Sequence, residues 1–448
     1  MTVERGQWSS KIGFIFAAAG SAIGLGNIWR FPYVVGENGG GAFVLLYVFF
    51  VLIIGLPYML AELALGRSVQ RNPVGSIDAI KPRSPWKAVG FLGVLTGLGI
   101  LSFYGVIAGW TVGYIYKMLV GNPGGFSAFI SDPVSVLLLF GFFILLTAAI
   151  VHGGVSGGIE RWSKILMPVF FVLLLVLIIY SNTLEGAARG LKFYLYPDFS
   201  KLTGKVILAA LGQAFFSLSL GMGLMITYGS YVSKKENLVV SAAWISLFDT
   251  VIAVMAGLII FPALFAMGQS PEAGPKLVFV VFPELFASIP GGMFVGALFF
   301  ILLSVAALTS TISLLEVPVA YMVDEKKVPR KTIVWVVAFV TFLIGIPSAL
   351  SQGANDFFTN FGWIPKRLVS EDFLSQMSFL FGDFSLAFGA LLLSVFIGWI
   401  WGARKAADEL VQGAAGFSKY AGFWIFLVKY FIPLVVFVIL LNLFGLFD

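Results

Sequence analysis

Long stretches of this sequence contain no charged side chain. Crossing about 30 Å of hydrocarbon takes roughly 20 mostly apolar residues in a helix, and the runs 88–116, 165–184 and 206–233 are of that kind. Hydrophobic residues make up 59% of the 448 positions and charged residues only 11%, which excludes an ordinary soluble domain. The chain is therefore predicted to be an all-α polytopic membrane protein, because helices satisfy their own backbone hydrogen bonds in lipid.

Eleven runs of this kind are predicted to span the membrane. One of them, 238–271, is interrupted by a single charge, Asp249. Another, 285–315, is too long for one helix and contains a Pro-Gly-Gly break at 288–292, so it is predicted to begin with a re-entrant or surface hairpin, and its helix is expected to start near Met293. The eleven runs are 12–29, 42–61, 88–116, 134–151, 165–184, 206–233, 238–271, 285–315, 332–355, 384–403 and 430–447.

The distribution of Lys and Arg in the short loops predicts the orientation, because cytoplasmic loops carry the excess. With the N-terminus inside, most of the 28 Lys and Arg residues fall in inner segments. The exception is 189–205, which lies outside in this arrangement despite its basic residues. An odd number of spans then puts the C-terminus outside, and the chain is predicted to be a multi-pass protein of the plasma membrane, that is, a bacterial inner membrane.

The composition excludes several other classes of protein. The net charge of +6 is accounted for by the loops, and no basic patch with interleaved aromatic residues predicts nucleic-acid binding. An intramembrane enzyme needs a nucleophile with a base, yet the sequence has no cysteine and its single histidine, His152, is predicted at a loop edge. A channel needs a continuous polar pore. No enzymatic activity, no channel and no obligatory protein partner are inferred.

Two of the predicted spans have the wrong composition for a plain lipid-facing helix. The first contains glycines and polar residues through 19–27, and the sixth does so through 213–223. Small residues can serve close helix packing alone. Interrupted segments in corresponding positions of two halves, however, indicate an inverted-repeat transporter with its site near the bilayer midplane. We expect one transporter domain, 1–448, with a first repeat at 12–184, a second at 206–403 and a last helix within 420–448.

Several polar groups inside the predicted spans are candidates for function. Asp249 is one, since a carboxylate at this depth costs at least about 2.5 kcal/mol without a partner. Glu62, near the inner end of the second span, is as compatible with a structural hydrogen bond to a broken helix as with transport. The hydroxyl cluster Thr309–Thr311 lies in an otherwise apolar run, although such hydroxyls usually bond to their own helix.

At these residues the chain resembles the neurotransmitter:sodium symporter family. The most specific stretch is 20–43, with Asn27-Ile28-Trp29-Arg30-Phe31-Pro32 inside it, and the resemblance covers nearly the whole chain, from Trp8 to Asp448. It implies the leucine-transporter fold, a 5+5 inverted repeat with helices 1 and 6 broken. Among bacterial members the chain looks closest to the eleven-helix type that transports hydrophobic amino acids.

The resemblance implies two sodium sites built from oxygen ligands, as a hard cation prefers. The first would use Ala22, Asn27, Ser217, Asp249 and the substrate carboxylate, and the second Gly20, Ile23, Ala306, Thr309 and Ser310. The family often has asparagine where Asp249 stands, and some chloride-independent members have an acid where this chain has Ala253. We expect Asp249 to supply the fixed negative charge, so that chloride is not needed. The alternative is that Asp249 couples a proton.

The resemblance also implies how an amino acid would bind. The backbone amides of Leu25 and Gly26, at the start of a half-helix, and the hydroxyl of Tyr104 would hold its carboxylate. Gly24 stands where monoamine carriers have an aspartate, so a true amino acid is expected. Met222 and its apolar neighbours predict a hydrophobic or aromatic side chain. The predicted substrate contacts are Ala22, Ile23, Gly24, Leu25, Gly26, Ile100, Tyr104, Phe216, Ser217, Ser219, Met222, Ser313 and Leu314.

Gates on the two sides are implied in the same way. On the inside, Arg5 and Asp324 resemble the ion pair of the family, near Trp8 and Tyr231, although exposed pairs are often worth only about 0–1 kcal/mol. On the outside, Arg30 would stand above the substrate with Phe216 as a lid. The position of its usual acidic partner falls on Ser378, and Asp383 is a possible substitute. Gly158 and Pro168 resemble a helix-unwinding motif, although proline also kinks helices for structural reasons.

The sequence therefore predicts a sodium-coupled symporter that imports hydrophobic and aromatic L-amino acids by alternating access. Two sodium ions are the only cofactors expected, and the partners are the amino-acid substrate, sodium and the lipid bilayer. The alternative is a proton-coupled or sodium-independent amino-acid carrier on the same fold.

Overall fold

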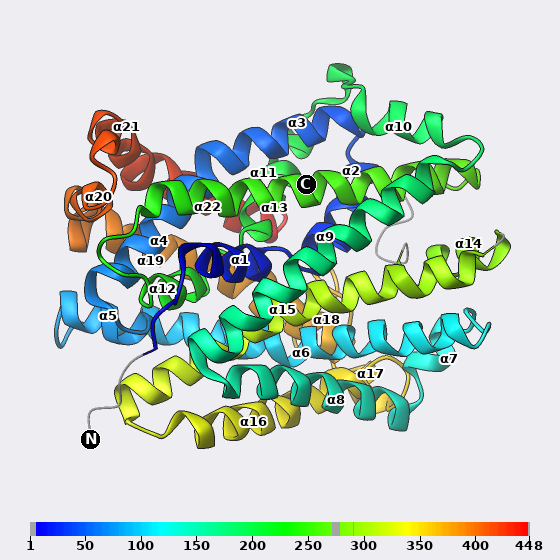
Figure 1. Ribbon diagram of the computed structural model, residues 1–448, viewed down its shortest axis with the longest axis horizontal. Coiled ribbons are helices and arrows are strands. Elements are labelled where there is room, and N and C mark those ends of the chain that lie inside the picture. Colours follow the sequence, from blue (N-terminus) through cyan, green and yellow to red (C-terminus); the bar gives the residue numbers. More distant parts are fainter. Residues whose placement is uncertain (1–5, 271–277, 290, 447–448) are drawn as a thin grey trace.

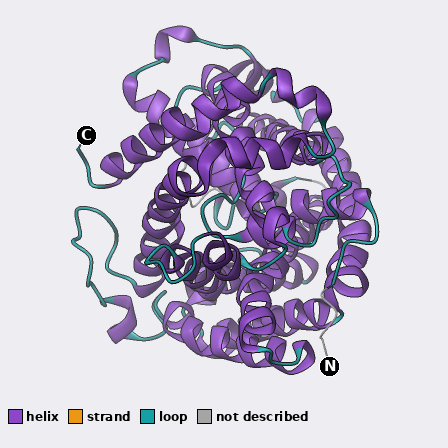
Figure 2. Ribbon diagram, turned by 90° about the vertical axis from the view of Figure 1, so that its left-hand side faces the viewer, coloured by secondary structure: helices purple, strands orange, loops and turns teal. Residues whose placement is uncertain are grey.

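The computed structural model describes residues 6–270, 278–289 and 291–446. Every regular element in these ranges is a helix, which confirms the all-α prediction. The long helices run roughly along the longest dimension of the molecule (Figure 1). Seen along that dimension, most of them are viewed end-on (Figure 2). The short helices α7 (Phe126–Ile130) and α14 (Val281–Ser288) lie at one end of the bundle. Helices α20 (Ala403–Val411) and α21 (Ala421–Phe426) lie at the other end, on the side of the N-terminus (Figure 1).

Nine helices within the described residues are long and apolar enough to cross a membrane, and a bent pair at the start of the chain makes a tenth. The predicted span 206–233 is divided into two helices that are each too short to cross alone, so the count of eleven stays a prediction. The nine are Gly41–Val69 (α3, η2 and α4), Lys87–Leu119 (α6), Pro133–His152 (α8), Val155–Asn182 (η3 and α9), Leu238–Ala266 (α13), Gly292–Lys326 (α15), Arg330–Leu350 (α16), Phe373–Val411 (α18, η6, α19, η7 and α20) and Ala421–Leu443 (α21, η9 and α22).

Two membrane spans begin earlier than predicted, because the prediction placed the start of a helix just after a charged residue. The span predicted at 384–403 begins at Phe373, because Asp383 lies inside it. The span predicted at 430–447 begins at Ala421, because Lys429 lies inside it. A single partly buried charge does not end a helix when its side chain reaches a polar region or a partner. By contrast, α15 begins at Gly292, one residue before the predicted Met293.

The first span is broken where the sequence predicts it. Helix α1 (Lys11–Ala22) ends at Ala22, and the next residue, Ile23, has an extended backbone with φ −73° and ψ 106°. The chain resumes as the π-helical turn η1 (Gly26–Arg30) followed by α2 (Phe31–Glu37), and its direction changes by 52°.

The sixth span is broken in the same way between α11 (Gly204–Ser217) and α12 (Leu224–Gly229). Gly221 and Gly223 have positive φ angles of 87° and 73°, which glycine adopts without steric cost. A side chain at Gly221 would also collide with the carbonyl of Leu386, since a Cβ there would lie 2.5 Å from that oxygen. The break therefore depends on these glycines.

Short helices cover the two ends of the bundle. Helix α5 starts at a cap in which the side chain of Asn72 accepts hydrogen bonds from the N–H groups of Val74 and Gly75. Part of the hairpin predicted at 288–292 lies outside the described residues; α14 ends at Ser288 and packs against α15. The short elements are α5 (Pro73–Ile80), α7 (Phe126–Ile130), α10 (Ala187–Leu195), η4 (Phe199–Lys201), α14 (Val281–Ser288), α17 (Asp356–Thr359) and η8 (Ala415–Lys419).

Candidate substrate and ion site

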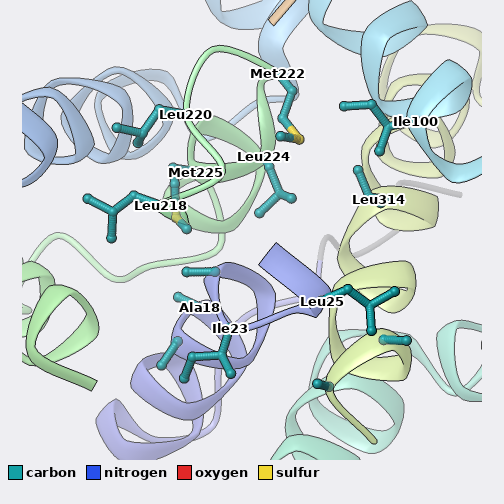
Figure 3. Close-up of a cluster of buried hydrophobic side chains, with 14 of the residues drawn as sticks. Ala18, Ile23, Leu25, Ile100, Leu218, Leu220, Met222, Leu224, Met225 and Leu314 are labelled. Atoms are coloured by element: carbon teal, nitrogen blue, oxygen red, sulfur yellow. The ribbon is translucent and has the colours of Figure 1, made fainter. Parts of the chain in front are cut away.

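The two helix breaks lie close together among buried side chains (Figure 3). Hydrogen bonds join them: Ser219 Oγ donates to the carbonyl of Ser21 at 3.4 Å, Gln213 Nε2 donates to the carbonyl of Gly26 at 3.4 Å, and Asn27 Nδ2 donates to Ser217 Oγ at 3.1 Å. Freed backbone groups at such breaks need partners away from water. The breaks therefore form one polar centre inside an apolar bundle. The apolar side chains around it include Ile23, Leu25, Ile100, Leu218, Leu220, Met222 and Leu314 (Figure 3).

A buried carboxylate lies beside this centre. Asp249, on α13, accepts hydrogen bonds from Asn27 Nδ2 at 2.7 Å and from Ser217 Oγ at 2.8 Å. The hydroxyl of Tyr47 lies 2.9 Å from Ser217 Oγ and donates to Asp249 at 3.3 Å. All four side chains are buried, and none of the described Lys and Arg side chains forms an ion pair with Asp249. The structure thus brings together three residues of the first predicted sodium site.

The orientation of the Asn27 amide matters for any cation at this place. Its nitrogen faces Asp249 and Ser217, and its oxygen accepts a hydrogen bond from the N–H of Gly24 at 3.1 Å. A cation binds to the amide oxygen and not to the nitrogen. Binding an ion between Asn27 and Asp249 therefore requires the amide to turn over.

A second group of oxygen atoms lies where α1 ends against α15. Ser310 Oγ lies 3.4 Å from the carbonyl oxygens of Ser21 and Ile23, and 3.3 Å from that of Ala306. Thr309 Oγ1 lies 2.9 Å from the carbonyl of Ala306 and 3.5 Å from that of Ile23. Four residues of the second predicted sodium site thus lie together. The fifth, Gly20, packs against Thr309, since a Cβ on Gly20 would lie 3.2 Å from the Cβ of Thr309.

A cavity of about 430 Å³ opens between the breaks. Of the thirteen predicted substrate contacts, eleven line it. Ile23 and Ser313 do not: both are buried, and Ser313 Oγ donates to the carbonyl of Ser310 at 2.7 Å. The eleven are Ala22, Gly24, Leu25, Gly26, Ile100, Tyr104, Phe216, Ser217, Ser219, Met222 and Leu314.

The floor of the cavity has no room for a side chain at Gly24. A Cβ there would lie 2.6 Å from Ser310 Oγ and 2.9 Å from the hydroxyl of Tyr104. That hydroxyl accepts a hydrogen bond from the N–H of Leu25 at 3.0 Å. Tyr104 is therefore held at the start of the half-helix, where backbone amides favour an anion.

The wall of the cavity on the predicted outer side was only partly expected from the sequence. Arg30 and Asp383 form an ion pair of 3.7 Å, in which both side chains are partly exposed, and the Arg30 guanidinium lies 4.1 Å from the ring centre of Phe216. Ser378 also lines the cavity. The loop residues Leu368, Val369 and Ser370 reach it too, although nothing in their sequence indicates a wall.

At the predicted inner end, part of the expected gate can be placed. Arg5 lies outside the described residues. Asp324 accepts hydrogen bonds from the backbone N–H of Asn72 at 2.9 Å and from Asn72 Nδ2 at 3.2 Å. Trp8 donates through Nε1 to the carbonyl of Tyr228 at 3.0 Å, and its ring contacts that of Tyr231 edge-on.

Sequence reasoning missed the buried acid beneath this gate. Glu316 accepts from the hydroxyl of Tyr231 at 2.6 Å and forms a bidentate pair with Arg330, at 2.9 and 2.5 Å. The acid and the base are fourteen positions apart on different helices. No local pattern could have indicated the pair.

The structure also places three other residues singled out from the sequence, Gly158, Pro168 and Glu62. Gly158 lies in the π-helical turn η3 (Val155–Glu160), which precedes α9 (Arg161–Asn182) with Pro168 inside it. Glu62 is buried and its Oε1 accepts from the N–H of Gly221, in the second break, at 2.7 Å. That contact is the structural hydrogen bond to a broken helix, one of the two roles that the sequence allows for Glu62.

Paired helix breaks around a central cavity, inside a bundle of long apolar helices, define a multi-pass membrane transporter. The chain belongs to the sodium:neurotransmitter symporter family, whose model matches residues 5–123 and 130–446. It is therefore a sodium-dependent transporter, and its family consists of transporters rather than enzymes.

Individual relatives agree with this assignment. An uncharacterised sodium-dependent transporter of Bacillus subtilis, YhdH, is 41% identical over 98% of both chains. One from Haemophilus influenzae is 36% identical, again over 98% of both. The crystal structure of MhsT in complex with L-phenylalanine matches with a TM-score of 0.86 and 45% identity, over 98% of this chain and all of that one. The similarity confirms the leucine-transporter fold expected from the sequence.

Proposed function

We propose that this transporter carries hydrophobic and aromatic L-amino acids into the cell, driven by sodium and without chloride. The observation that carries the proposal is the cavity between the two helix breaks, which combines freed backbone amides with apolar walls. Ile100, Met222 and Leu314 line it and none carries a charge. The phenylalanine bound by the related MhsT supports the same substrate class.

The amino-acid carboxylate would bind near Leu25 and Gly26. The N–H of Leu25 now donates to the hydroxyl of Tyr104, and a carboxylate would accept hydrogen bonds from both groups. Anions are favoured at this position because the first N–H groups of a half-helix have no partner within the helix. Gly24 supports a substrate with its own carboxylate, since no acidic side chain fits at that position.

We infer two sodium sites from the oxygen atoms described above. The buried carboxylate of Asp249 supports the first, because an isolated buried charge is strongly destabilising and no basic side chain of the described residues pairs with it. A sodium ion would neutralise it and bind the amide oxygen of Asn27 after the amide turns. The neutral carbonyls and hydroxyls around Ser310 suit a second sodium ion.

Asp249 also supports independence from chloride. A carboxylate fixed beside the first sodium site supplies the negative charge that chloride would otherwise bring. A second candidate function rests on the same residue: Asp249 is buried and no basic side chain of the described residues pairs with it. Burial disfavours the charged form of a carboxyl group, so Asp249 could hold a proton when no sodium ion is bound, which would make the carrier proton-coupled.

Alternating access would use the two ends of the central cavity. Arg30, Phe216 and Asp383 lie at its outer side, and Trp8, Tyr231 and Asp324 lie at the predicted inner end. Opening of the inside would involve η3, where Gly158 lies. In this arrangement the N-terminus is cytoplasmic and the C-terminus extracytoplasmic in a bacterial inner membrane, and 12–184 and 206–403 are the two repeats.

Uptake of labelled phenylalanine into proteoliposomes tests the proposal. We expect uptake with an inward sodium gradient, no change when gluconate replaces chloride, and competition by excess leucine or tryptophan. Uptake driven by a proton gradient in the absence of sodium would favour the second candidate. Failure of leucine and tryptophan to compete would reject the substrate class.

A further inference from the structure

The last membrane span carries a charge inside its apolar length. Lys429 lies eight residues beyond Ala421, where the span begins, and fourteen before its end at Leu443. At roughly 1.5 Å per residue its Cα is about 12 Å from the start of the helix. Charged side chains at such depths are rare and usually have a functional partner.

The structure shows no acidic partner for this lysine among the described residues. Its Nζ lies 5.3 Å from the ring centre of Tyr430, and that ring contacts Trp399 edge-on at 5.9 Å. Its backbone packs on η7 (Phe396–Gly402), since a Cβ on Gly398 would lie 3.3 Å from the Cα of Lys429. Tyr430 and Trp399 are 53% and 45% exposed, so the rings beside the lysine lie on the lipid-facing surface of the bundle.

The side chain of Lys429 has one favourable direction. Helical side chains point toward the N-terminal end of their own helix, and a long lysine stem reaches from apolar surroundings to the membrane interface. That end of the span is next to α20 (Ala403–Val411), with which α21 is in contact. Figure 1 shows α20 and α21 together at one end of the bundle.

The same end presents further positive charge. Arg404, Lys405 and Lys419 are exposed there, against a single exposed acid, Asp408. The acid that follows, Glu409, is buried and pairs with Arg67 at 2.7 Å and with Lys234 at 3.1 Å, so it does not neutralise the exposed cations. The aromatic rings of Phe423 and Phe426, which follow Lys419 in the last span, are 59% and 53% exposed.

We propose that this surface, formed by η7, α20 and the first half of the last span, is a binding site for an anionic phospholipid. Lys429 binds the headgroup phosphate from within the membrane, Arg404, Lys405 and Lys419 add the interfacial positive charge, and the acyl chains lie along Phe423, Phe426 and Tyr430. Charge complementarity selects this ligand, because this surface combines a cation with exposed, lipid-facing aromatic side chains. Each cation near an anionic surface contributes about fivefold in affinity.

Native mass spectrometry of the delipidated, folded chain tests this site. Titrations with phosphatidylglycerol and with phosphatidylcholine of the same acyl chains give the two affinities. We expect a preference for phosphatidylglycerol, a loss of about fivefold in that affinity in Lys429→Met, and little change with phosphatidylcholine. Lys429→Arg keeps the charge and is expected to bind as the unaltered protein does.

Lys117 provides a matched control. Its Nζ also lies over aromatic rings near the end of a span, 5.9 Å from those of Tyr114 and Phe129, and it is outside the proposed site. Lys117→Met is expected to leave the lipid preference unchanged. Should Lys429→Met fail to fold, the exposed double variant Arg404→Gln with Lys405→Gln is expected to weaken phosphatidylglycerol binding. Equal affinities for the two lipids, or equal losses in Lys429→Met and Lys117→Met, would overturn the proposal.

Discussion

Replacing Gly24 with alanine adds one methyl group to the wall of the proposed substrate site and tests its position. A Cβ there would lie 2.6 Å from Ser310 Oγ and 2.9 Å from the Tyr104 hydroxyl, and both distances are shorter than van der Waals contact. Moving Ser310 disturbs the proposed second sodium site, and moving Tyr104 breaks its hydrogen bond with the Leu25 N–H. Overpacking of this kind costs about 1–3 kcal/mol. Gly24→Ala is therefore expected to weaken amino-acid binding roughly 5- to 150-fold, at 1.4 kcal/mol per decade.

Equilibrium binding of labelled phenylalanine in saturating sodium measures this effect. The control is Gly212→Ala, because a Cβ at Gly212, on α11, meets no atom within 4 Å. We expect Gly212→Ala to bind phenylalanine as the unaltered protein does. If Gly24→Ala also binds normally, the proposed position of the substrate at the first helix break is wrong.

Three other predictions follow from the same geometry. Asp249→Asn is expected to make uptake depend on chloride, measured by replacing chloride with gluconate; unchanged chloride-independent uptake in the variant would contradict the role of the carboxylate. Asp383→Asn is expected to speed phenylalanine release up to about fivefold, because a partly exposed ion pair is worth about 0–1 kcal/mol. Arg30→Ala is expected to speed release more, since it also loses the contact with the Phe216 ring. Equal release rates in the two variants and the unaltered protein would contradict the proposed outer gate. Glu62→Gln keeps an acceptor for the Gly221 N–H and should melt near the unaltered protein, whereas Glu62→Ala is expected to lose about 1–3 kcal/mol of stability; identical melting of the two variants would count against the structural role.

The sequence predicted those features that have a local chemical cause. Glycines and polar residues inside two apolar runs indicated the breaks after Ala22 and Ser217, because such residues have no place in a plain lipid-facing helix. The boundaries at Asp383 and Lys429 were wrong because a charge was taken to end a span. Whether a charge can enter a span depends on the neighbouring helix, which the local sequence does not contain.

The details of the site depend on tertiary packing. Tyr47 lies against Asp249 although it is 202 positions away, and no motif marks it. Ile23 and Ser313 were expected at the substrate, but both are buried and neither lines the cavity, because the packing of neighbouring helices decides which residues face it. The loop at 368–370 reaches the cavity only because the chain folds back over it, which the local sequence does not indicate.

The central claim is that sodium and a hydrophobic amino acid bind together at the two helix breaks. A titration of the purified protein with L-phenylalanine, in sodium and in potassium at equal ionic strength, tests it most directly. We expect binding in sodium and at least about a tenfold loss of affinity in potassium, equivalent to 1.4 kcal/mol. Equal affinity in the two salts, or no binding of phenylalanine in sodium, would contradict the account.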